Sequence, residues 1–284
     1  MQLIPGPSLA AGGRRFVPAL AFAALYLCVG LATRLLLWAH FGTAAEVPAA
    51  HLPLLLLAGA VNDAVESLYL VAPLAIYLLF LPDRWYRSRW NRALLAAGFV
   101  ATIAGLVFLA IAEYFFFEEF DARFNLVAFD YLVYPAEVFV DIWEAYPVVP
   151  GLLASLTLGA VLTWRLRRWL LPGEAPASSL RQRLAPFGVH ATLLVGAIAV
   201  YPTNALSWSS NRVENELLQN GYSSFFRAAE TNEIDYHAYY ASRDPAGNLR
   251  LLASALEAGG GKLIRFDEGR LDRRFPARAD GLGR

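Results

Sequence analysis

Long apolar runs with almost no charge recur along the chain. The first run extends from Phe16 to Trp38 and is interrupted only by Arg34. Four further runs cover residues 52–81, 94–117, 148–164 and 187–206. About 20 apolar residues in a helix cross the hydrocarbon core of a bilayer, which is roughly 30 Å thick. The pattern therefore predicts five transmembrane helices in residues 1–206.

A cleaved signal peptide is the alternative interpretation of the first run. The apolar part of a signal peptide is only about 7 to 15 residues long and is followed by small residues at the cleavage site. The run from Phe16 is longer and continues through bulky leucines to Trp38. We therefore interpret it as a membrane anchor.

The composition agrees with a membrane protein. Hydrophobic residues make up 57% of the chain and charged residues 17%, and the mean hydropathy is +0.42. Soluble domains contain about 25% charged residues, so this composition excludes a secreted or cytosolic globular enzyme. The formal net charge is zero, which gives no general attraction to nucleic acid. The single cysteine, Cys28, excludes an intrachain disulfide.

The arginines predict the orientation of the helices. Two precede the first run, none lies in the first loop, four lie in the second, one in the third and five in the fourth. Short loops rich in Lys and Arg stay in the cytoplasm. The alternation predicts a cytoplasmic N-terminus, five crossings and a C-terminal segment outside.

The third loop, residues 118–146, combines acidic and aromatic side chains. From Pro135 onward its apolar residues, such as Phe139 and Trp143, recur at helical spacing, while Glu137 and Asp141 fall on another face. We expect a helix that lies in the membrane surface.

Residues 207–284 are more polar, and we expect a helical segment outside the membrane that ends in a flexible basic tail. Asn211, with Glu214 three residues later, resembles a capping box that opens a helix. A second helix is expected from Pro245 to the glycines that begin at Gly259. The expected fold class is all-α, with five transmembrane helices, an interfacial helix and this helical segment.

Four ionisable residues lie within the predicted spans, where charge is unfavourable and indicates pairing or function. They are Arg34, Asp63, Glu66 and Glu113. At about 1.5 Å per helical residue, all four lie near the outer end of their helices. Two readings remain open: an ion pair that packs helices together, or a polar pocket that receives a lipid headgroup or a docked domain.

No self-contained catalytic motif is found. The chain has no Gly-x-Ser-x-Gly, no Walker loop, no dinucleotide-binding glycine motif and no His-Glu-x-x-His. We therefore expect no catalytic residue, no metal ligand and no cofactor within this chain.

Two stretches nevertheless carry a family resemblance. Arg123-Phe-Asn125 and Asp130-Tyr131-Leu-Val-Tyr134 in the third loop resemble the outer loop of the lipoteichoic acid synthase family of Gram-negative bacteria. Asn215-Glu216-Leu217 and Asn220-Gly221 are similar to the segment that links that family's five-helix membrane domain to its outer catalytic domain. On this resemblance the candidate residues for lipid or domain docking are Glu119, Arg123, Asn125, Asp130, Tyr131, Asn215, Glu216 and Asn220.

The resemblance implies a phosphoglycerol or phosphoethanolamine transferase whose sulfatase-like domain uses a Thr nucleophile and a divalent metal. The residues after Tyr240 are too few for such a domain. We therefore expect a lipid-presenting membrane anchor in the bacterial inner membrane, with its C-terminus in the periplasm. Its expected partners are membrane lipids and a sulfatase-like domain in the same or another chain. The alternative is a noncatalytic lipid-binding or scaffold protein of the cell envelope.

Overall fold

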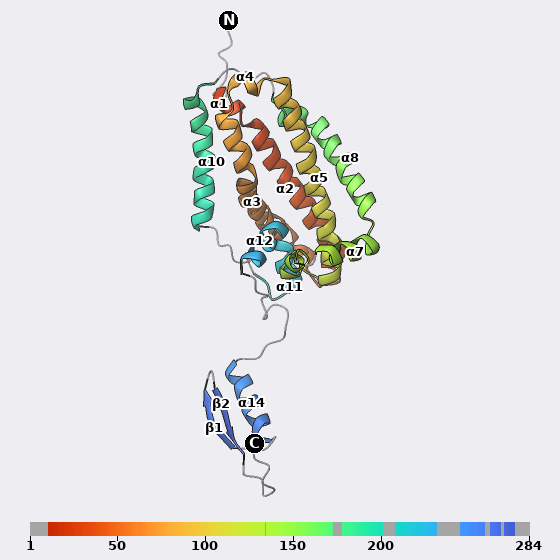
Figure 1. The fold of residues 1–284 in the computed structure, drawn as a ribbon, viewed down its shortest axis with the longest axis vertical. Helices are drawn as coiled ribbons and strands as arrows, with labels where there is room; N and C mark the ends of the chain where they lie inside the picture. The colour runs from red at the N-terminus through yellow and green to blue at the C-terminus, as the bar shows by residue number, and fades with distance from the viewer. Residues whose placement is uncertain are drawn as a thin grey trace. The chain divides into compact units, whose positions relative to one another are not determined.

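The computed structural model describes residues 11–133, 135–172, 178–200, 208–231, 245–258, 262–267 and 270–275. The chain divides into two compact units, Met1–Ile234 and Asp235–Arg284. The first unit is a bundle of long helices (Figure 1). Its main elements are α1 (Ala11–Arg14), α2 (Val17–Leu37), α3 (Leu52–Phe80), α4 (Asp83–Tyr86), α5 (Arg89–Phe120), α8 (Val148–Arg165), α9 (Arg167–Leu170) and α10 (Leu180–Val200).

Shorter elements join these helices or lie at one end of the bundle. They are a π-helical turn (Trp38–Gly42), a 3₁₀ turn (Ala49–His51), α6 (Leu126–Asp130), α7 (Pro135–Ala145), α11 (Arg212–Leu218) and α12 (Gly221–Thr231). The second unit contains α14 (Pro245–Ala258), β1 (Lys262–Asp267) and β2 (Arg270–Arg274).

Among the described residues, four helices are long and apolar enough to cross a membrane. They are Val17–Gly42, Ala49–Phe80, Arg89–Phe120 and Val148–Arg165. The fifth predicted run, residues 187–206, starts inside α10, which packs along α3. Residues 201–206 lie outside the described part of the chain, so the fifth crossing stays a prediction.

Two of these helices have bounds that differ from the expected apolar runs. α5 begins before the apolar run expected at Leu94, because Ser88 caps it: the Ser88 Oγ accepts the Asn91 N–H at 3.1 Å. It ends where Asp121 adopts a left-handed conformation, with φ of 49°. In α2 the expected span continues through the π-helical turn to Gly42.

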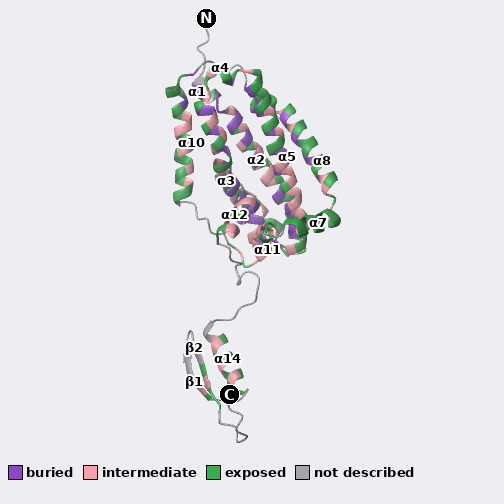
Figure 2. Cartoon of the chain, in the orientation of Figure 1, coloured by how far each residue is buried: buried purple, intermediate pink, exposed green. Residues whose placement is uncertain are grey.

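The core of the bundle lies around α2, between α3 and α5. Phe22, Tyr26, Phe99 and Ile103 are buried in it. Buried residues concentrate on the inner helix faces, whereas α8 and α10 are largely exposed (Figure 2). Large apolar side chains cover those outer surfaces, for example Leu153, which is 60% exposed. Such a surface suits contact with lipid rather than with water.

The second unit corrects the expectation of an all-α fold with a flexible basic tail. β1 and β2 pair antiparallel, from Lys262 with Arg274 to Asp267 with Arg270, and α14 packs against β1. The expected helix from Pro245 is present. The charged residues of this stretch indicated a flexible tail, although apolar residues such as Leu263 and Phe266 recur within it at the positions of the hairpin.

The division into units also differs from the expected boundary after residue 206. α11 and α12 belong to the helical unit, because they pack against its helices. Their contacts with α2, α3 and the residues around α5 form the candidate site.

Candidate functional site

A buried ion pair joins α2 to α3 at the end of the bundle where α11 lies, called here the α11 end. The Arg34 Nη1 and Nη2 atoms donate to Asp63 Oδ2 and Oδ1 at 2.8 and 3.0 Å. The two side chains are 1% and 0% exposed. The pair predicted from the sequence is therefore present, with Asp63 as the partner of Arg34.

Arg34 also binds backbone atoms of the segment that follows α11. Its Nε donates to the Leu217 carbonyl at 2.9 Å and its Nη2 donates to the Gln219 carbonyl at 3.1 Å. The last carbonyls of a helix have no partner within the helix, and that end of the helix is partly negative. Arg34 thus caps α11 from another helix.

Two asparagines complete this cap. The Asn62 Nδ2 donates to the Leu218 carbonyl at 2.9 Å. The Asn220 Nδ2 lies 2.8 Å from Asp63 Oδ1 and 2.9 Å from the Tyr26 hydroxyl. Asp63 therefore binds both the cation from α2 and the chain that leaves α11.

A second buried ion pair lies beside the first. Arg123, which follows the left-handed turn after α5, donates from Nη1 to Glu113 Oε1 at 2.6 Å. Its Nε and Nη2 donate to the carbonyls of Glu216 and Leu217 at 3.2 and 3.3 Å. Its backbone N–H donates to Glu216 Oε2 at 2.9 Å. Arg123 thus provides the cation for Glu113, which the sequence had grouped around Arg34.

Glu216 is a buried carboxylate on α11. Burial raises the pKa of Glu216 above its ordinary value of 4.5, although the hydrogen bond from the Arg123 N–H and the nearby arginines act in the opposite direction. Glu66, the fourth ionisable residue of the spans, lies near Asp63 and interacts with Ser223 of α12.

Glycine lets the backbone approach these charged groups. A Cβ added at Gly59 would overlap the guanidinium of Arg34. A Cβ added at Gly221 would overlap the carboxylate of Glu113. The first position lets α3 pack on the ion pair, and the second lets α12 begin directly beside Glu113.

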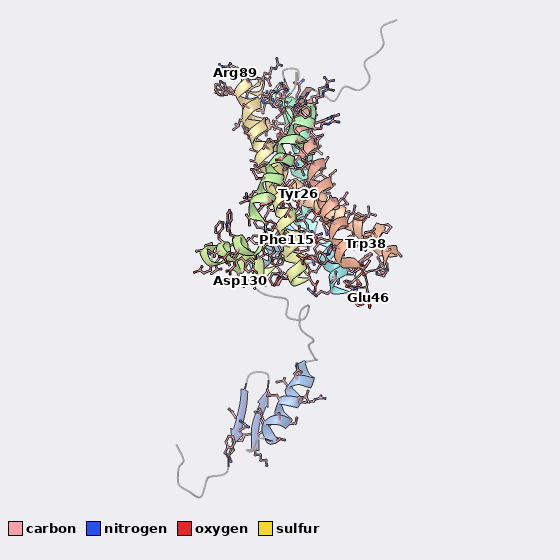
Figure 3. All side chains as sticks on the ribbon, turned by 90° about the vertical axis from the view of Figure 1, so that its right-hand side faces the viewer. Tyr26, Trp38, Glu46, Arg89, Phe115 and Asp130 are labelled. Atoms are coloured by element: carbon pink, nitrogen blue, oxygen red, sulfur yellow. The ribbon has the colours of Figure 1, made fainter. Side chains whose placement is uncertain are left out.

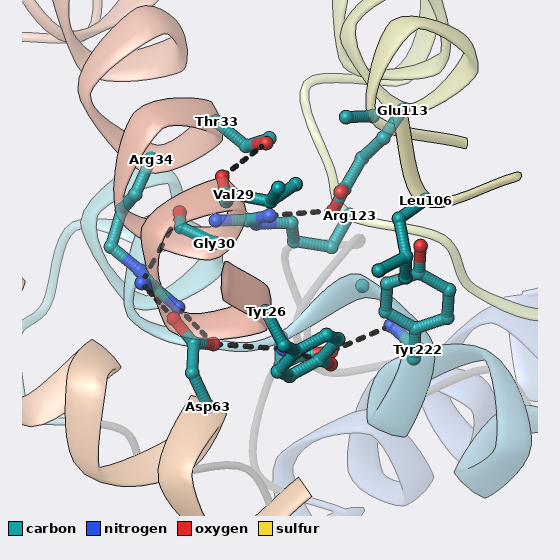
Figure 4. Close-up of a pocket in the computed structure, with 13 residues that line it drawn as sticks. Tyr26, Val29, Gly30, Thr33, Arg34, Asp63, Leu106, Glu113, Arg123 and Tyr222 are labelled. Atoms are coloured by element: carbon teal, nitrogen blue, oxygen red, sulfur yellow. Dashed lines mark hydrogen bonds and ion pairs between the residues drawn. The ribbon is translucent and has the colours of Figure 1, made fainter. Parts of the chain in front are cut away.

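The two ion pairs line one small pocket (Figure 4). Tyr26, Thr33, Asn220 and Tyr222 complete its polar lining. Most of the charge that faces it is already bound to the opposite charge or to backbone carbonyls. We conclude that the cluster docks α11 and the start of α12 onto the bundle. The sequence pattern had left open an ion pair that packs helices together and a polar pocket for a lipid headgroup or a docked domain.

The N-terminal end of α11 is held separately. The Asn211 Oδ1 accepts the Glu214 N–H at 3.2 Å, so the predicted cap is present. The Glu214 side chain does not close a capping box. It is 1% exposed and contacts His51 Nδ1 at 2.7 Å, which links α11 to the start of α3. The sequence pattern did not predict this pair, because the two residues are far apart in the chain.

The other predicted docking residues are dispersed. Asn125 caps α6 by accepting the Val127 N–H at 2.9 Å, and Asn215 binds the backbone of Ser209.

The remaining three predicted docking residues lie outside the buried cluster. Glu119 and Asp130 are exposed. Tyr131 packs edge-on near Phe120, with ring centroids 6.5 Å apart.

α7 is present as predicted, and its apolar side chains are uncovered. Phe139, Ile142 and Trp143 are 61%, 38% and 49% exposed, and the rings of Phe139 and Trp143 stack. α7 lies across the direction of the long helices near Asp130 (Figure 3). Its location in a membrane surface stays a prediction.

The sequence pattern did not indicate a further charge cluster at the opposite end of the bundle, in which two buried arginines bind a partly exposed aspartate. Arg15 and Arg183 bind Asp83 Oδ1 at 2.6 and 2.8 Å. Arg15 also donates to the Leu78 carbonyl, and Arg183 to the Leu79 carbonyl. In the sequence pattern both arginines indicate only the orientation of the helices. The acidic Asp83 directly after a long apolar run was the available sign that a cation binds there.

Comparison of the chain with protein-family models, curated proteins and solved structures finds no match. Among the described residues, no three His, Cys, Asp or Glu side chains are grouped as a metal ion would require.

Proposed function

We propose that this chain is the membrane-anchoring and lipid-presenting module of a lipoteichoic-acid-synthase-like phosphoglycerol or phosphoethanolamine transferase. In this proposal it lies in a bacterial inner membrane with its C-terminal unit in the periplasm. The sulfatase-like catalytic domain, with its divalent metal, is supplied by the same or another chain.

The observation that carries the proposal is the meeting of the two stretches that resemble this family. Arg123 of the third loop binds both the side chain and the backbone of Glu216, which lies in the second stretch. Asn220 of the second stretch binds Asp63 inside the bundle. One part of each stretch, Arg123 in the first and Glu216 and Asn220 in the second, thus takes part in one docking arrangement, as expected for a segment that links a membrane domain to an outer domain.

This arrangement suits an anchor. α11 has seven residues, too few to be stable alone, and it is held by buried charges at one end and by Asn211 and Glu214 at the other. A domain that follows α12 would therefore start from a defined place on the bundle. The uncovered apolar residues of α7 suit contact with lipid beside that place.

Reconstitution tests the proposal. A sulfatase-like domain is sought in the downstream reading frame or in neighbouring genes and is added to vesicles that contain labelled phosphatidylglycerol or phosphatidylethanolamine, a divalent metal and this chain. We expect release of labelled diacylglycerol only when the domain and the chain are both present. Equal release by the domain with and without the chain would favour the noncatalytic scaffold instead.

The chain alone should transfer no headgroup. Transfer of the sulfatase-like type needs a nucleophile beside a divalent metal. Purified chain in the same vesicles should release no more diacylglycerol than a heat-inactivated control. Metal-dependent release that is abolished by Glu119→Gln or Asp130→Asn would contradict the proposal.

A further inference from the structure

Charge is distributed very unevenly over a chain whose formal net charge is zero. The end of the bundle around α4, called here the α4 end, comprises residues 11–16, 79–94, 163–172 and 178–184. It carries many exposed arginines, namely Arg14, Arg84, Arg87, Arg89, Arg92, Arg165, Arg167, Arg168 and Arg181. Among the described residues of this end, Asp83 is the acidic one, and Arg15 and Arg183 both bind it. The exposed surface of the α4 end is therefore strongly positive.

Exposed tryptophans accompany these arginines. Trp90 and Trp164 are 70% and 63% exposed. The Arg89 guanidinium lies 5.5 Å from the Trp90 ring centre, and that of Arg167 lies 5.0 Å from the Trp164 ring centre. Arg167 Nη1 also donates to the Trp164 carbonyl at 2.7 Å. Aromatic contacts of this kind hold a guanidinium in place while its outer edge stays available.

Packing brings two of these groups to one corner of the bundle. α5 packs along α8 and contacts α9, so the first turn of α5 lies beside the end of α8. This corner, called here the arginine corner, is formed by Arg89, Trp90, Arg92, Trp164, Arg165, Arg167 and Arg168. Arg89 lies at the opposite end of the bundle from Glu46 and Asp130 (Figure 3).

The corner borders an apolar surface. Leu94 of α5 is 63% exposed and Val161 of α8 is 49% exposed, and each lies within four residues of an arginine of its own helix. A ligand that contacts both surfaces needs a negatively charged group and a long apolar part. One guanidinium group can donate two parallel hydrogen bonds to the oxygens of a phosphate. Tryptophans are enriched at the membrane–water interface, where the lipid headgroups lie.

We propose that the arginine corner binds phospholipids with a net negative headgroup, such as phosphatidylglycerol or cardiolipin, in the leaflet next to the α4 end. A zwitterionic headgroup presents an ammonium together with its phosphate, and the dense positive charge of the corner disfavours it. The binding needs only that the bundle lies in a membrane, so the proposal is independent of the proposed transferase function.

Two matched triple variants test the site. Arg89→Gln/Arg92→Gln/Arg168→Gln removes three charges from the corner, and Arg14→Gln/Arg84→Gln/Arg181→Gln removes three exposed charges from the rest of the α4 end. Each protein is reconstituted in phosphatidylcholine vesicles with spin-labelled phosphatidylglycerol, cardiolipin or phosphatidylcholine. The fraction of motionally restricted label gives the relative affinity.

We expect the unchanged protein to prefer the anionic lipids several-fold. The corner variant should lose most of this preference, and the matched variant should keep it. Equal association of all lipids with the unchanged protein would overturn the proposal. An equal loss in the two variants would also overturn it, since it would show a diffuse field rather than a site.

If the corner variant does not fold, Arg89→Lys/Arg92→Lys/Arg168→Lys keeps the charge but removes the planar guanidinium. We expect it to show a reduced preference for the anionic lipids. A preference equal to that of the unchanged protein would contradict the guanidinium contacts proposed here.

Discussion

Arg34 directs its guanidinium at Asp63 and at two carbonyls near the end of α11. A buried ion pair of this kind can contribute little to the free energy of unfolding, because the guanidinium and the carboxylate both lose their hydration on burial. Loss of one partner is costly, because the other charge then stays buried without compensation.

Arg34→Leu should therefore destabilise the bundle by about 3–5 kcal/mol, the range typical of a broken buried pair. It should also loosen α11, because the Gln219 carbonyl loses the Arg34 donor and the Leu217 carbonyl keeps only the longer contact with Arg123. Thermal unfolding in detergent and protease cleavage near α11 measure the two effects. Arg89→Leu is the control, since Arg89 is exposed. Equal losses for the two variants would count against the role of the pair.

Glu216 gives the docking a pH dependence. Its pKa is raised in the folded state by burial, so between its ordinary value of 4.5 and the raised value the folded protein binds more protons than the unfolded protein. The contribution of Glu216 to the free energy of unfolding therefore falls as the pH rises through that interval.

Glu216→Gln should flatten the dependence of thermal stability on pH in that interval, because the amide does not titrate. Stability is measured at a series of pH values from 4.5 upward. Glu119→Gln, which changes an exposed carboxylate, should leave the slope as it is in the unchanged protein. An unchanged slope in Glu216→Gln would show that Glu216 is not the titrating group.

At the scale of elements, the contact between α2 and α3 depends on the absence of a side chain at Gly59. A methyl group there would overlap the Arg34 guanidinium. Gly98 of α5 offers a matched position, because a Cβ there meets no atom within 4 Å.

Gly59→Ala should lower stability by displacing Arg34 from Asp63. Gly98→Ala should have no such effect and should raise stability by up to about 1 kcal/mol, because alanine favours a helix more than glycine does. Thermal unfolding of both variants in the same detergent measures the difference. A neutral Gly59→Ala would mean that the helices can separate without loss of the ion pair.

At the scale of the whole molecule, the distribution of arginines predicts the orientation of the helices in the membrane. Reporter fusions at Arg89, Asp130, Arg181 and Asn248 should read inside, outside, inside and outside. The fusion at Asn248 tests the fifth crossing, because four crossings would leave it inside. A reporter that is active outside at Arg89 would overturn the whole arrangement.

Much of the helical architecture was determined by the sequence alone. Apolar runs long enough to cross a bilayer predicted α2, α3, α5 and α8, because a helix satisfies its backbone hydrogen bonds within one segment. The cap at Asn211 and the amphipathic helix from Pro135 were also readable, since both depend on residues a few positions apart.

The tertiary structure alone decided which charges meet. The sequence indicated that Arg34 had an acidic partner, but the assignment of Arg123 to Glu113 and of Glu214 to His51 depends on how the helices rotate and pack. The sequence did not predict the docking of α11 by arginines from two other segments either. Every residue has a backbone carbonyl, so the residue pattern does not show which carbonyls accept hydrogen bonds from these arginines. Local patterns determine elements, whereas contacts between distant segments depend on the depth and rotation at which those elements pack.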